Sequence, residues 1–315
     1  MKMVFLDAGT MGPVSLDPIA TLGELVLYPG STHEEACRRV ADADVVLTNK
    51  VPVDDAIMAA APGLKLICVA ATGLNHIDLD AARRRGIEVR NVAGYSTESV
   101  VQVTFMHMLS LMCRPAFYDA EVKDFTYSRS GVANDVREPF RELWGKTVGI
   151  IGMGAIGQRV AQVAEAFGMK PVYYSTSGTR HCTQWPALSL EELMEVSDIV
   201  SIHCPLNERT RGLVGARELS HMKPGAYLVN MARGAVVDEV ALAQAVDSGR
   251  IAGAALDVFS TEPIPEDHPL LHTSHPERLR FTPHIAWASH ESLDRLVSRM
   301  AENICECMRD KPTCV

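Results

Sequence analysis

The chain has 315 residues, of which 47% are hydrophobic and 22% charged. This is the composition of a folded globular protein, and the length suffices for two domains that each bury a core. The formal net charge of −9 at pH 7 argues against nucleic acid or an anionic membrane surface as the main partner. Residues 1–7 lack a signal-peptide pattern, and no apolar run approaches the roughly 18 to 20 residues of a membrane span. We therefore expect a cytoplasmic protein.

Eight cysteines are distributed along the chain, most of them inside apolar strands or helices. They form neither a spaced disulfide framework nor a set of metal ligands at the usual intervals. We expect reduced thiols and no structural metal.

Short apolar segments alternate with helical segments in the first hundred residues, as is typical of parallel α/β sheets. The predicted strands lie near residues 4–7, 25–28, 45–48, 66–70 and 88–91. The predicted helices between them include residues 32–41, 54–60 and 79–85. A long helix follows from about residue 97 to 114, where Pro115 ends it, and the polar stretch 124–139 is interpreted as surface structure.

A second α/β unit starts at Lys146. Its predicted strands are residues 147–151, 171–174, 199–203, 226–230, 254–258 and 280–282. Its predicted helices include residues 155–167, 190–196, 216–221 and 239–248. Six strands with helices between them are what a complete dinucleotide-binding domain needs.

The first strand of this unit runs into a glycine-rich turn, Gly152-Met153-Gly154-Ala155-Ile156-Gly157. A turn between a strand and a helix presents backbone N–H groups and the positive end of the helix dipole to a phosphate. In dinucleotide-binding domains the first glycine makes the tight turn, the second lets the backbone approach the pyrophosphate, and the third lets helix and strand pack closely. The turn therefore predicts nucleotide binding.

One more helix, near residues 289–308, comes too late to belong to the second sheet. We infer that the chain crosses back and packs this helix on the first domain. The predicted fold is thus α/β with two domains: a Rossmann dinucleotide-binding domain, 99–285, inserted in a discontinuous flavodoxin-like substrate domain, 1–98 plus 286–315. The cleft between the domains is the expected active site.

Arg233, Glu262 and His284 each follow a predicted strand of the second unit. Because ligands bind outside the carboxyl ends of strands in open α/β sheets, we expect these side chains to point at one crevice. Arginine offers a planar fork for a carboxylate. Histidine exchanges protons near neutral pH, and a carboxylate bonded to its far nitrogen would orient the ring and favour its protonated form. With a nucleotide turn, these groups indicate carbonyl reduction by a nicotinamide.

Each of these residues also has an ordinary structural interpretation. An arginine after a strand is often part of a surface ion pair, a glutamate before proline is often only loop, and a histidine in an apolar segment is often a core residue. The combination, together with the upstream glycine turn, favours catalysis.

Five stretches occur in a fixed order: Asn230-Met231-Ala232-Arg233-Gly234, Val237-Asp238-Glu239, Ala254-Ala255-Leu256-Asp257-Val258-Phe259, Glu262-Pro263 and Thr282-Pro283-His284-Ile285-Ala286-Trp287. They resemble the motifs of the D-isomer-specific 2-hydroxyacid dehydrogenase family, and the resemblance covers essentially the whole chain. It implies that Arg233, Glu262 and His284 are the catalytic set and that Asp257 binds the nicotinamide carboxamide. The other cofactor-binding residues expected are Gly152, Gly154, Ala155, Ile156, Gly157, Ser175, Thr176, Ser177, Arg180, Cys204, Pro205, Thr210, Met231, Ala232 and Thr104.

The segment Val69-Ala70-Ala71-Thr72-Gly73 resembles the substrate-carboxylate loop of the family. Backbone N–H groups of Ala71, Thr72 and Gly73 would then help Arg233 and His284 bind the acid, although Ala71 stands where the family often has glycine. Residues 94–100 together with Trp287 most resemble glycerate dehydrogenases, also called hydroxypyruvate reductases, and Trp287 is expected at the substrate. The leading substrates are small anionic 2-oxo acids, hydroxypyruvate or glyoxylate, which would be reduced to D-glycerate or glycolate.

The second strand of an NAD-preferring site usually ends in an acidic residue that binds the ribose hydroxyls. This chain instead has Ser175-Thr176-Ser177-Gly178-Thr179-Arg180. Small hydroxyl residues and an arginine would not repel a 2′-phosphate, so both NAD(H) and NADP(H) stay open as cofactors.

Two alternatives remain: a phosphoglycerate dehydrogenase-like enzyme, and a corepressor-like binding protein that senses dinucleotides. The resemblance also suggests a homodimer, formed through residues 100–145.

Overall fold

The computed structural model describes residues 1–179 and 182–309. It consists of two compact units: unit 1, Met1–Ser96 with Trp287–Val315, and unit 2, Thr97–Ala286. The predicted boundaries after residues 98 and 285 lie within two residues of these limits.

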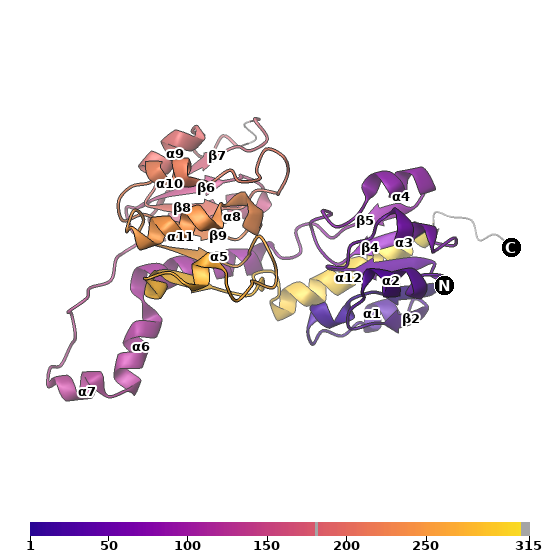
Figure 1. Cartoon of the computed structure of the whole chain (residues 1–315), viewed down its shortest axis with the longest axis horizontal. Helices are drawn as coiled ribbons and strands as arrows, with labels where there is room; N and C mark the ends of the chain where they lie inside the picture. Colours follow the sequence, from indigo (N-terminus) through magenta and orange to yellow (C-terminus); the bar gives the residue numbers. More distant parts are fainter. Residues whose placement is uncertain (180–181, 310–315) are drawn as a thin grey trace. The chain divides into compact units, whose positions relative to one another are not determined.

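Unit 1 is built on a five-stranded parallel sheet in the order β2-β1-β3-β4-β5 (Figure 1). Its strands are β1 (Lys2–Phe5), β2 (Glu24–Leu27), β3 (Val45–Thr48), β4 (Leu66–Val69) and β5 (Glu88–Arg90). The order 2-1-3-4-5 is that of flavodoxin-like sheets, as the sequence predicts.

Helices cover both faces of this sheet because alternate strand residues point to opposite sides. Val4, Val46 and Ile67 belong to a core shared with the helices of one face. On the other face Phe5 and Leu47 share a core with Leu296, Met300 and Ile304 of the last helix. The helices of unit 1 are α1 (Asp17–Ala20), α2 (His33–Arg39), α3 (Asp55–Ala59), α4 (Leu79–Arg85) and α12 (His290–Arg309), with the 3-10 helix η1 (Ala8–Met11).

Unit 2 contains a six-stranded parallel sheet in the order β11-β10-β9-β8-β6-β7. Its strands are β6 (Thr147–Ile151), β7 (Lys170–Tyr174), β8 (Ile199–Ile202), β9 (Tyr227–Asn230), β10 (Gly253–Leu256) and β11 (Leu279–Phe281). The chain places β7 on one side of β6 and then crosses to β8 on the other side. The switch point therefore lies at the carboxyl end of β6, where doubly wound sheets bind their ligands.

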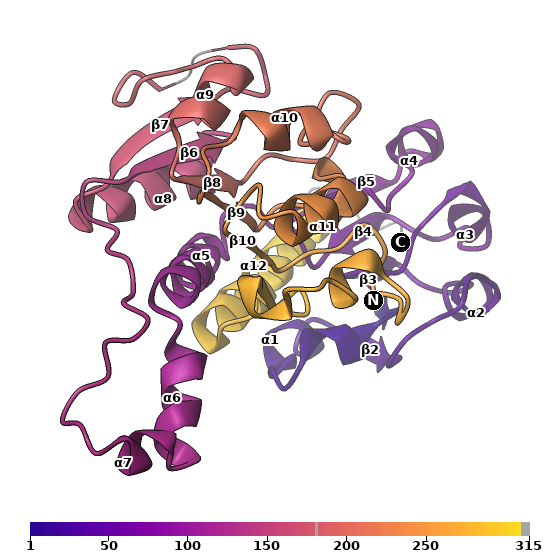
Figure 2. The same ribbon diagram turned by 60° about the vertical axis from the view of Figure 1, so that its left-hand side comes forward.

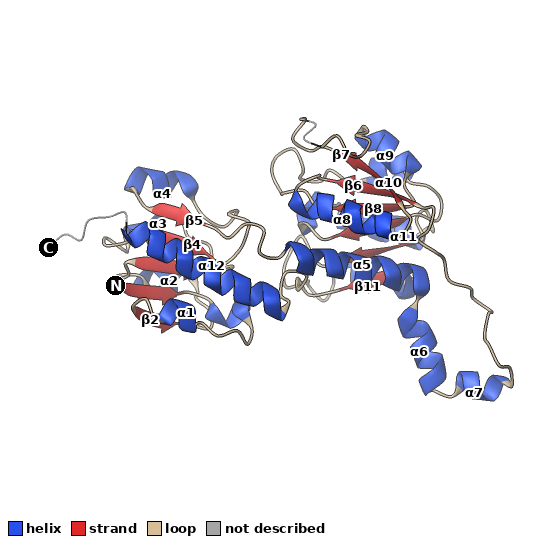
Figure 3. Ribbon diagram, turned by 180° about the vertical axis from the view of Figure 1, so that it is seen from behind, coloured by secondary structure: helices blue, strands red, loops and turns tan. Residues whose placement is uncertain are grey.

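The helices of unit 2 enclose this sheet in two layers. α5 (Thr97–Cys113) and α8 (Ala155–Ala166) lie together on one face, as Figure 3 shows, and share a core with Val148 and Ile150. The opposite core includes residues of α9 (Leu190–Val196), α10 (Ala216–His221) and α11 (Glu239–Asp247). Short 3-10 helices complete the unit: η2 (Gly234–Val236), η3 (Pro269–Leu271) and η4 (Pro276–Arg278). None of the helices described is long and apolar enough to span a membrane.

Two helices that the sequence does not predict project from unit 2 after α5 (Figures 1 and 2). α5 ends at Cys113 and Arg114 adopts a left-handed conformation with φ of 52°. Pro115 then opens α6 (Pro115–Lys123), because proline is tolerated in a first helical turn that needs no N–H donor. α7 (Thr126–Ser130) follows, and neither helix has a buried residue. We call residues 115–145 the arm.

A close backbone approach joins the segment after β9 to the segment after β10. A Cβ at Gly234 would lie 1.8 Å from the carbonyl carbon of Phe259 and 2.1 Å from the nitrogen of Ser260. Only glycine fits there, so the turn that carries Arg233 lies directly against the loop that leads to Glu262.

Gly234→Ala should destabilise the protein by about 1–3 kcal/mol, since the added methyl group forces backbone apart from backbone. The measurement is the midpoint of urea unfolding. Gly30→Ala is the matched control, because a Cβ at Gly30 meets no atom within 4 Å. Equal stability of the two variants would contradict the close approach.

Candidate active site

The glycine-rich turn is held between its two neighbouring strands. Gly152 donates its N–H to Tyr174 O at 3.0 Å, and its φ of 97° lies in the region that favours glycine. A Cβ on Gly152 would lie 2.7 Å from the nitrogen of Cys204, and one on Gly157 would lie 2.2 Å from Gly152 O. Burial raises the pKa of the Cys204 thiol to about 11, so this side chain is neutral at the turn.

The first turn of α8 is open to a ligand. Gly154 is its N-cap, and within the described residues no side chain caps the helix. A Cβ at Gly154 would meet no atom within 4 Å. The N–H groups that begin the helix at Ala155 and Ile156 are the donors that such a helix start offers to an anion. These residues fit the pyrophosphate of a dinucleotide.

Hydroxyl groups line the loop after β7, where an acidic residue would favour NAD. Ser175 Oγ donates to Thr179 O at 2.6 Å, and Ser177 Oγ lies 2.9 Å from Thr179 Oγ1. Thr176, which lies between Ser175 and Ser177 in the sequence, is half-buried. Arg180, which was expected to complete this loop, lies outside the described residues.

Two predicted cofactor residues are fully buried. Thr210 Oγ1 donates to Pro205 O at 2.7 Å and closes the loop after β8. Thr104 Oγ1 donates to Val100 O at 2.7 Å within α5. Each hydroxyl proton is used in an internal hydrogen bond, and neither side chain has exposed surface to offer a ligand.

Arg233, Glu262 and His284 follow three adjacent strands of unit 2. Leu256 of β10 pairs with Asn230 of β9 on one side and with Phe281 of β11 on the other, so the three strands end at the same level. His284 Nδ1 lies 2.6 Å from Glu262 Oε2, the contact that the sequence predicts. Glu262 is fixed in turn, since its Oε1 accepts the N–H of Phe259 at 3.0 Å.

Arg233 extends from a turn that a buried asparagine holds. Asn230 has no exposed surface; its Oδ1 accepts the N–H of Ala232, and its Nδ2 donates to Arg233 O, each at 3.0 Å. Arg233 Nη1 donates to Ala232 O at 2.7 Å and the side chain is half-buried. Met231 and Ala232 are buried in this turn. Sequence reasoning gave no role to Asn230, although its place at the end of a buried strand was a signal.

Asp257, only 1% exposed, fixes the segment that carries His284. Its Oδ1 accepts from Thr282 Oγ1 at 2.6 Å and from the N–H of Ile285 at 2.9 Å, and its Oδ2 accepts the N–H of Ala286 at 2.9 Å. The N–H of His284 donates to Asp257 O at 2.7 Å. Since a carboxylate oxygen can accept two hydrogen bonds, Oδ2 can take a further donor.

The backbone of His284 has a φ of 55°, in the left-handed region. This conformation costs a residue with a side chain on the order of 1–3 kcal/mol and persists only where its surroundings impose it. The hydrogen bonds to Asp257 impose it here.

The predicted substrate residues of unit 1 occupy an anchored loop and the start of the last segment. Ala71 O accepts the N–H of Val92, and Thr72 Oγ1 donates to Val92 O, each at 3.0 Å. These anchoring bonds use a carbonyl oxygen and a hydroxyl. Gly73 follows in the same loop. Trp287 packs edge-on against Tyr95, with ring centroids 6.4 Å apart.

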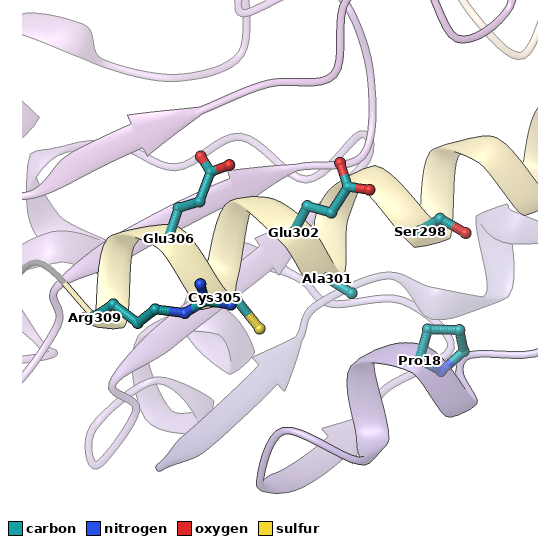
Figure 4. A pocket seen from close by; sticks show the side chains of 7 residues that line it. All are labelled: Pro18, Ser298, Ala301, Glu302, Cys305, Glu306 and Arg309. Carbon is teal, nitrogen blue, oxygen red and sulfur yellow. The ribbon is translucent and has the colours of Figure 1, made fainter.

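Three surface hollows are described, and their linings contain none of the predicted catalytic residues. Figure 4 shows the one of about 340 Å³ between α12 and Pro18 of α1, into which Ala301 and Cys305 project. Glu302 and Glu306 point away from Pro18. The lining of this hollow contains no histidine held by a carboxylate, in contrast to His284 with Glu262.

One group of possible metal ligands lies in the described part of unit 2: Glu191 and Glu195 of α9 with His221 of α10. Arg217 pairs with Glu191 at 2.9 Å, and His221 pairs with Glu195 at 3.4 Å. The guanidinium already neutralises one carboxylate, which disfavours a cation.

Comparison with known proteins shows the family of this chain. Residues 105–286 match the family model of the D-isomer specific 2-hydroxyacid dehydrogenase NAD binding domain. A hydroxypyruvate reductase of Blautia hydrogenotrophica is 35% identical over 325 residues, covering 99% of this chain and 98% of the relative.

Two solved structures share the fold. D-lactate dehydrogenase of Aquifex aeolicus, complexed with NAD and lactic acid, has a TM-score of 0.85 and 30% identity, covering 98% of this chain and 96% of that one. An acyclic imino acid reductase complexed with NADPH and D-arginine has a TM-score of 0.87 and 29% identity, covering 99% of both chains. The chain therefore belongs to the D-isomer specific 2-hydroxyacid dehydrogenase family and is an oxidoreductase that uses a nicotinamide dinucleotide.

Proposed function

We propose that this enzyme reduces a small 2-oxo acid, hydroxypyruvate or glyoxylate, to the D-2-hydroxy acid, and catalyses the reverse oxidation. The observation that carries the proposal is the 2.6 Å contact of His284 with Glu262, beside the turn that bears Arg233. The relative named hydroxypyruvate reductase, aligned over nearly the whole chain, supports this substrate class.

Arg233 binds the substrate carboxylate through its guanidinium fork, which matches the two oxygens of a carboxylate. The family resemblance implies that the backbone N–H groups of Ala71, Thr72 and Gly73 and the side chain of Trp287, all in unit 1, also serve the substrate.

His284 donates a proton from Nε2 to the carbonyl oxygen. Its Nδ1 is held by Glu262 Oε2 at 2.6 Å, so the orientation of the ring is fixed. The nicotinamide, when bound, supplies the hydride that reaches the carbonyl carbon. Asp257 would hold the carboxamide of the nicotinamide, since its Oδ2 can accept one more hydrogen bond. After the reaction His284 is neutral and regains its proton from solvent.

His284→Ala should lower kcat at least about a hundredfold, because general acid catalysis contributes about 10² to 10⁴ in rate. The measurement is the decay of nicotinamide absorbance with hydroxypyruvate. His33→Ala is the matched control, since His33 Nε2 makes a similar contact of 2.8 Å with Asp54 on the surface of unit 1. Near-full turnover by His284→Ala would refute the assignment.

We further propose that the cofactor loop accepts a 2′-phosphate. Residues 175–179 carry four hydroxyl side chains, those of Ser175, Thr176, Ser177 and Thr179. They include no carboxylate that would repel a phosphate. The imino acid reductase of the same fold binds NADPH.

The ratio of kcat/KM with NADPH to that with NADH tests this second proposal. We expect a ratio of about one or more in the wild type, and Ser177→Asp should lower it at least tenfold by placing a negative charge beside the phosphate. A strong NADH preference of the wild type would contradict the proposal.

The partner that we propose for the arm is a second copy of the chain. Six large apolar side chains of the arm are each more than half exposed: Val122, Phe125, Val132, Val136, Phe140 and Trp144. Soluble monomers rarely expose so many together, whereas interfaces between copies bury them.

Val136→Asp should convert the dimer to a monomer, because it places a charge in an apolar interface. Sedimentation equilibrium measures the mass. Val240→Asp on α11 makes the same chemical change at another exposed position and should leave the dimer intact. A monomeric wild type would refute the proposal.

A further inference from the structure

A chain of hydrogen bonds runs through the interior of unit 2, from α5 to the segment that carries His284. His107 of α5 is 2% exposed, and its Nε2 lies 3.0 Å from Thr282 Oγ1. Thr282 Oγ1 lies 2.6 Å from Asp257 Oδ1. In the sequence His107 is one of a few polar residues in an apolar helix, and its partners are about 150 residues or more away.

The donors and acceptors of this chain fix its direction. Thr282 donates its single hydroxyl proton to Asp257 Oδ1. The oxygen of Thr282 must then accept the proton that His107 carries on Nε2. Nδ1 of His107 is buried without a hydrogen-bond partner among the described residues. His107 is therefore the neutral Nε2–H tautomer.

The surroundings keep His107 in this neutral form. Burial lowers the pKa of the imidazole, the charge of Asp257 opposes this shift, and the charge of Arg280 adds to it. A second proton would occupy the buried Nδ1, where it would have no acceptor. An imidazole in an apolar helix face also costs free energy unless it is hydrogen-bonded, so packing alone does not explain a histidine here.

The far end of the chain reaches the backbone of the active-site segment. Asp257 accepts the N–H groups of Ile285 and Ala286, which directly follow His284. His284 itself has the left-handed φ of 55°. The orientation of the Asp257 carboxylate thus determines where the His284 backbone lies, and Thr282 with His107 behind it determines that orientation.

We propose that His107 is a positioning residue for the reaction: through Thr282 and Asp257 it holds His284 in the geometry for proton transfer. This inference rests on the proposed function, because it takes His284 as the proton donor. His107 touches neither substrate nor cofactor in this account. It acts only by holding, through Thr282, the carboxylate of Asp257, which in turn accepts the backbone N–H groups after His284.

Kinetics of three variants test the proposal. His107→Leu keeps an apolar side chain of similar size in the helix but removes the donor, and should lower kcat about tenfold to a hundredfold, since small displacements of a catalytic group have effects of this size. His107→Gln restores an N–H donor and should recover most of kcat. Met108→Leu, at a fully buried position of the same helix, should leave kcat unchanged.

A double-mutant cycle identifies the path. Thr282→Val removes the hydroxyl that links His107 to Asp257 and should match the loss of kcat in His107→Leu. Because both changes break one chain, the double variant should be no slower than either single variant. Additive losses would overturn the proposed path.

Histidine ring NMR of the cofactor-free protein gives a readout independent of turnover. We expect the proton of His107 on Nε2, and we expect the His284 ring signals to shift in His107→Leu and Thr282→Val but not in Met108→Leu. A proton on Nδ1 of His107, or unmoved His284 signals together with unchanged kcat, would overturn the inference. If the wild type does not reduce 2-oxo acids while the His284 signals still shift, the proposed function fails and the positioning role stands.

Discussion

The buried carboxylate of Asp257 is the interaction on which the candidate site depends. It lies at the end of β10, almost without exposed surface, and accepts hydrogen bonds from Thr282, Ile285 and Ala286. A buried charge without partners would be strongly destabilising, so the segment 282–286 is pinned wherever this carboxylate can be satisfied. The unusual backbone of His284 is one consequence of that constraint.

A second buried polar side chain fixes the turn that follows the neighbouring strand, β9. Asn230 ends β9 and uses both its oxygen and its amide nitrogen on the turn of Ala232 and Arg233. Gly234 then lets this turn meet the backbone of Phe259 and Ser260. These contacts fix the backbone positions from which the side chains of Arg233 and Glu262 extend. Because the backbone is fixed before substrate binds, less conformational entropy is lost on binding.

The parallel sheet explains why these devices occur together. Strands β9, β10 and β11 are adjacent and in register, so their carboxyl ends lie along one edge. The glycine turn follows β6 at the switch point of the same sheet. Unit 2 alone thus combines a helix start that no described side chain caps with an arginine and a histidine–glutamate pair.

Sequence alone predicted the α/β class, the place of every strand of the two sheets and the contact of His284 with Glu262, because these depend on local periodicity and on motifs with fixed spacing. It did not find the helices of the arm. Pro115 was a signal for the end of the preceding helix, but the same residue also begins α6. It also could not assign Asn230 or His107. Their roles depend on partners brought near by the tertiary fold, which no local pattern records. Asp257 marks the boundary: the sequence predicts it inside the strand 254–258, whereas the structure ends β10 at Leu256, and the backbone donors that Asp257 accepts depend on how the chain folds around it.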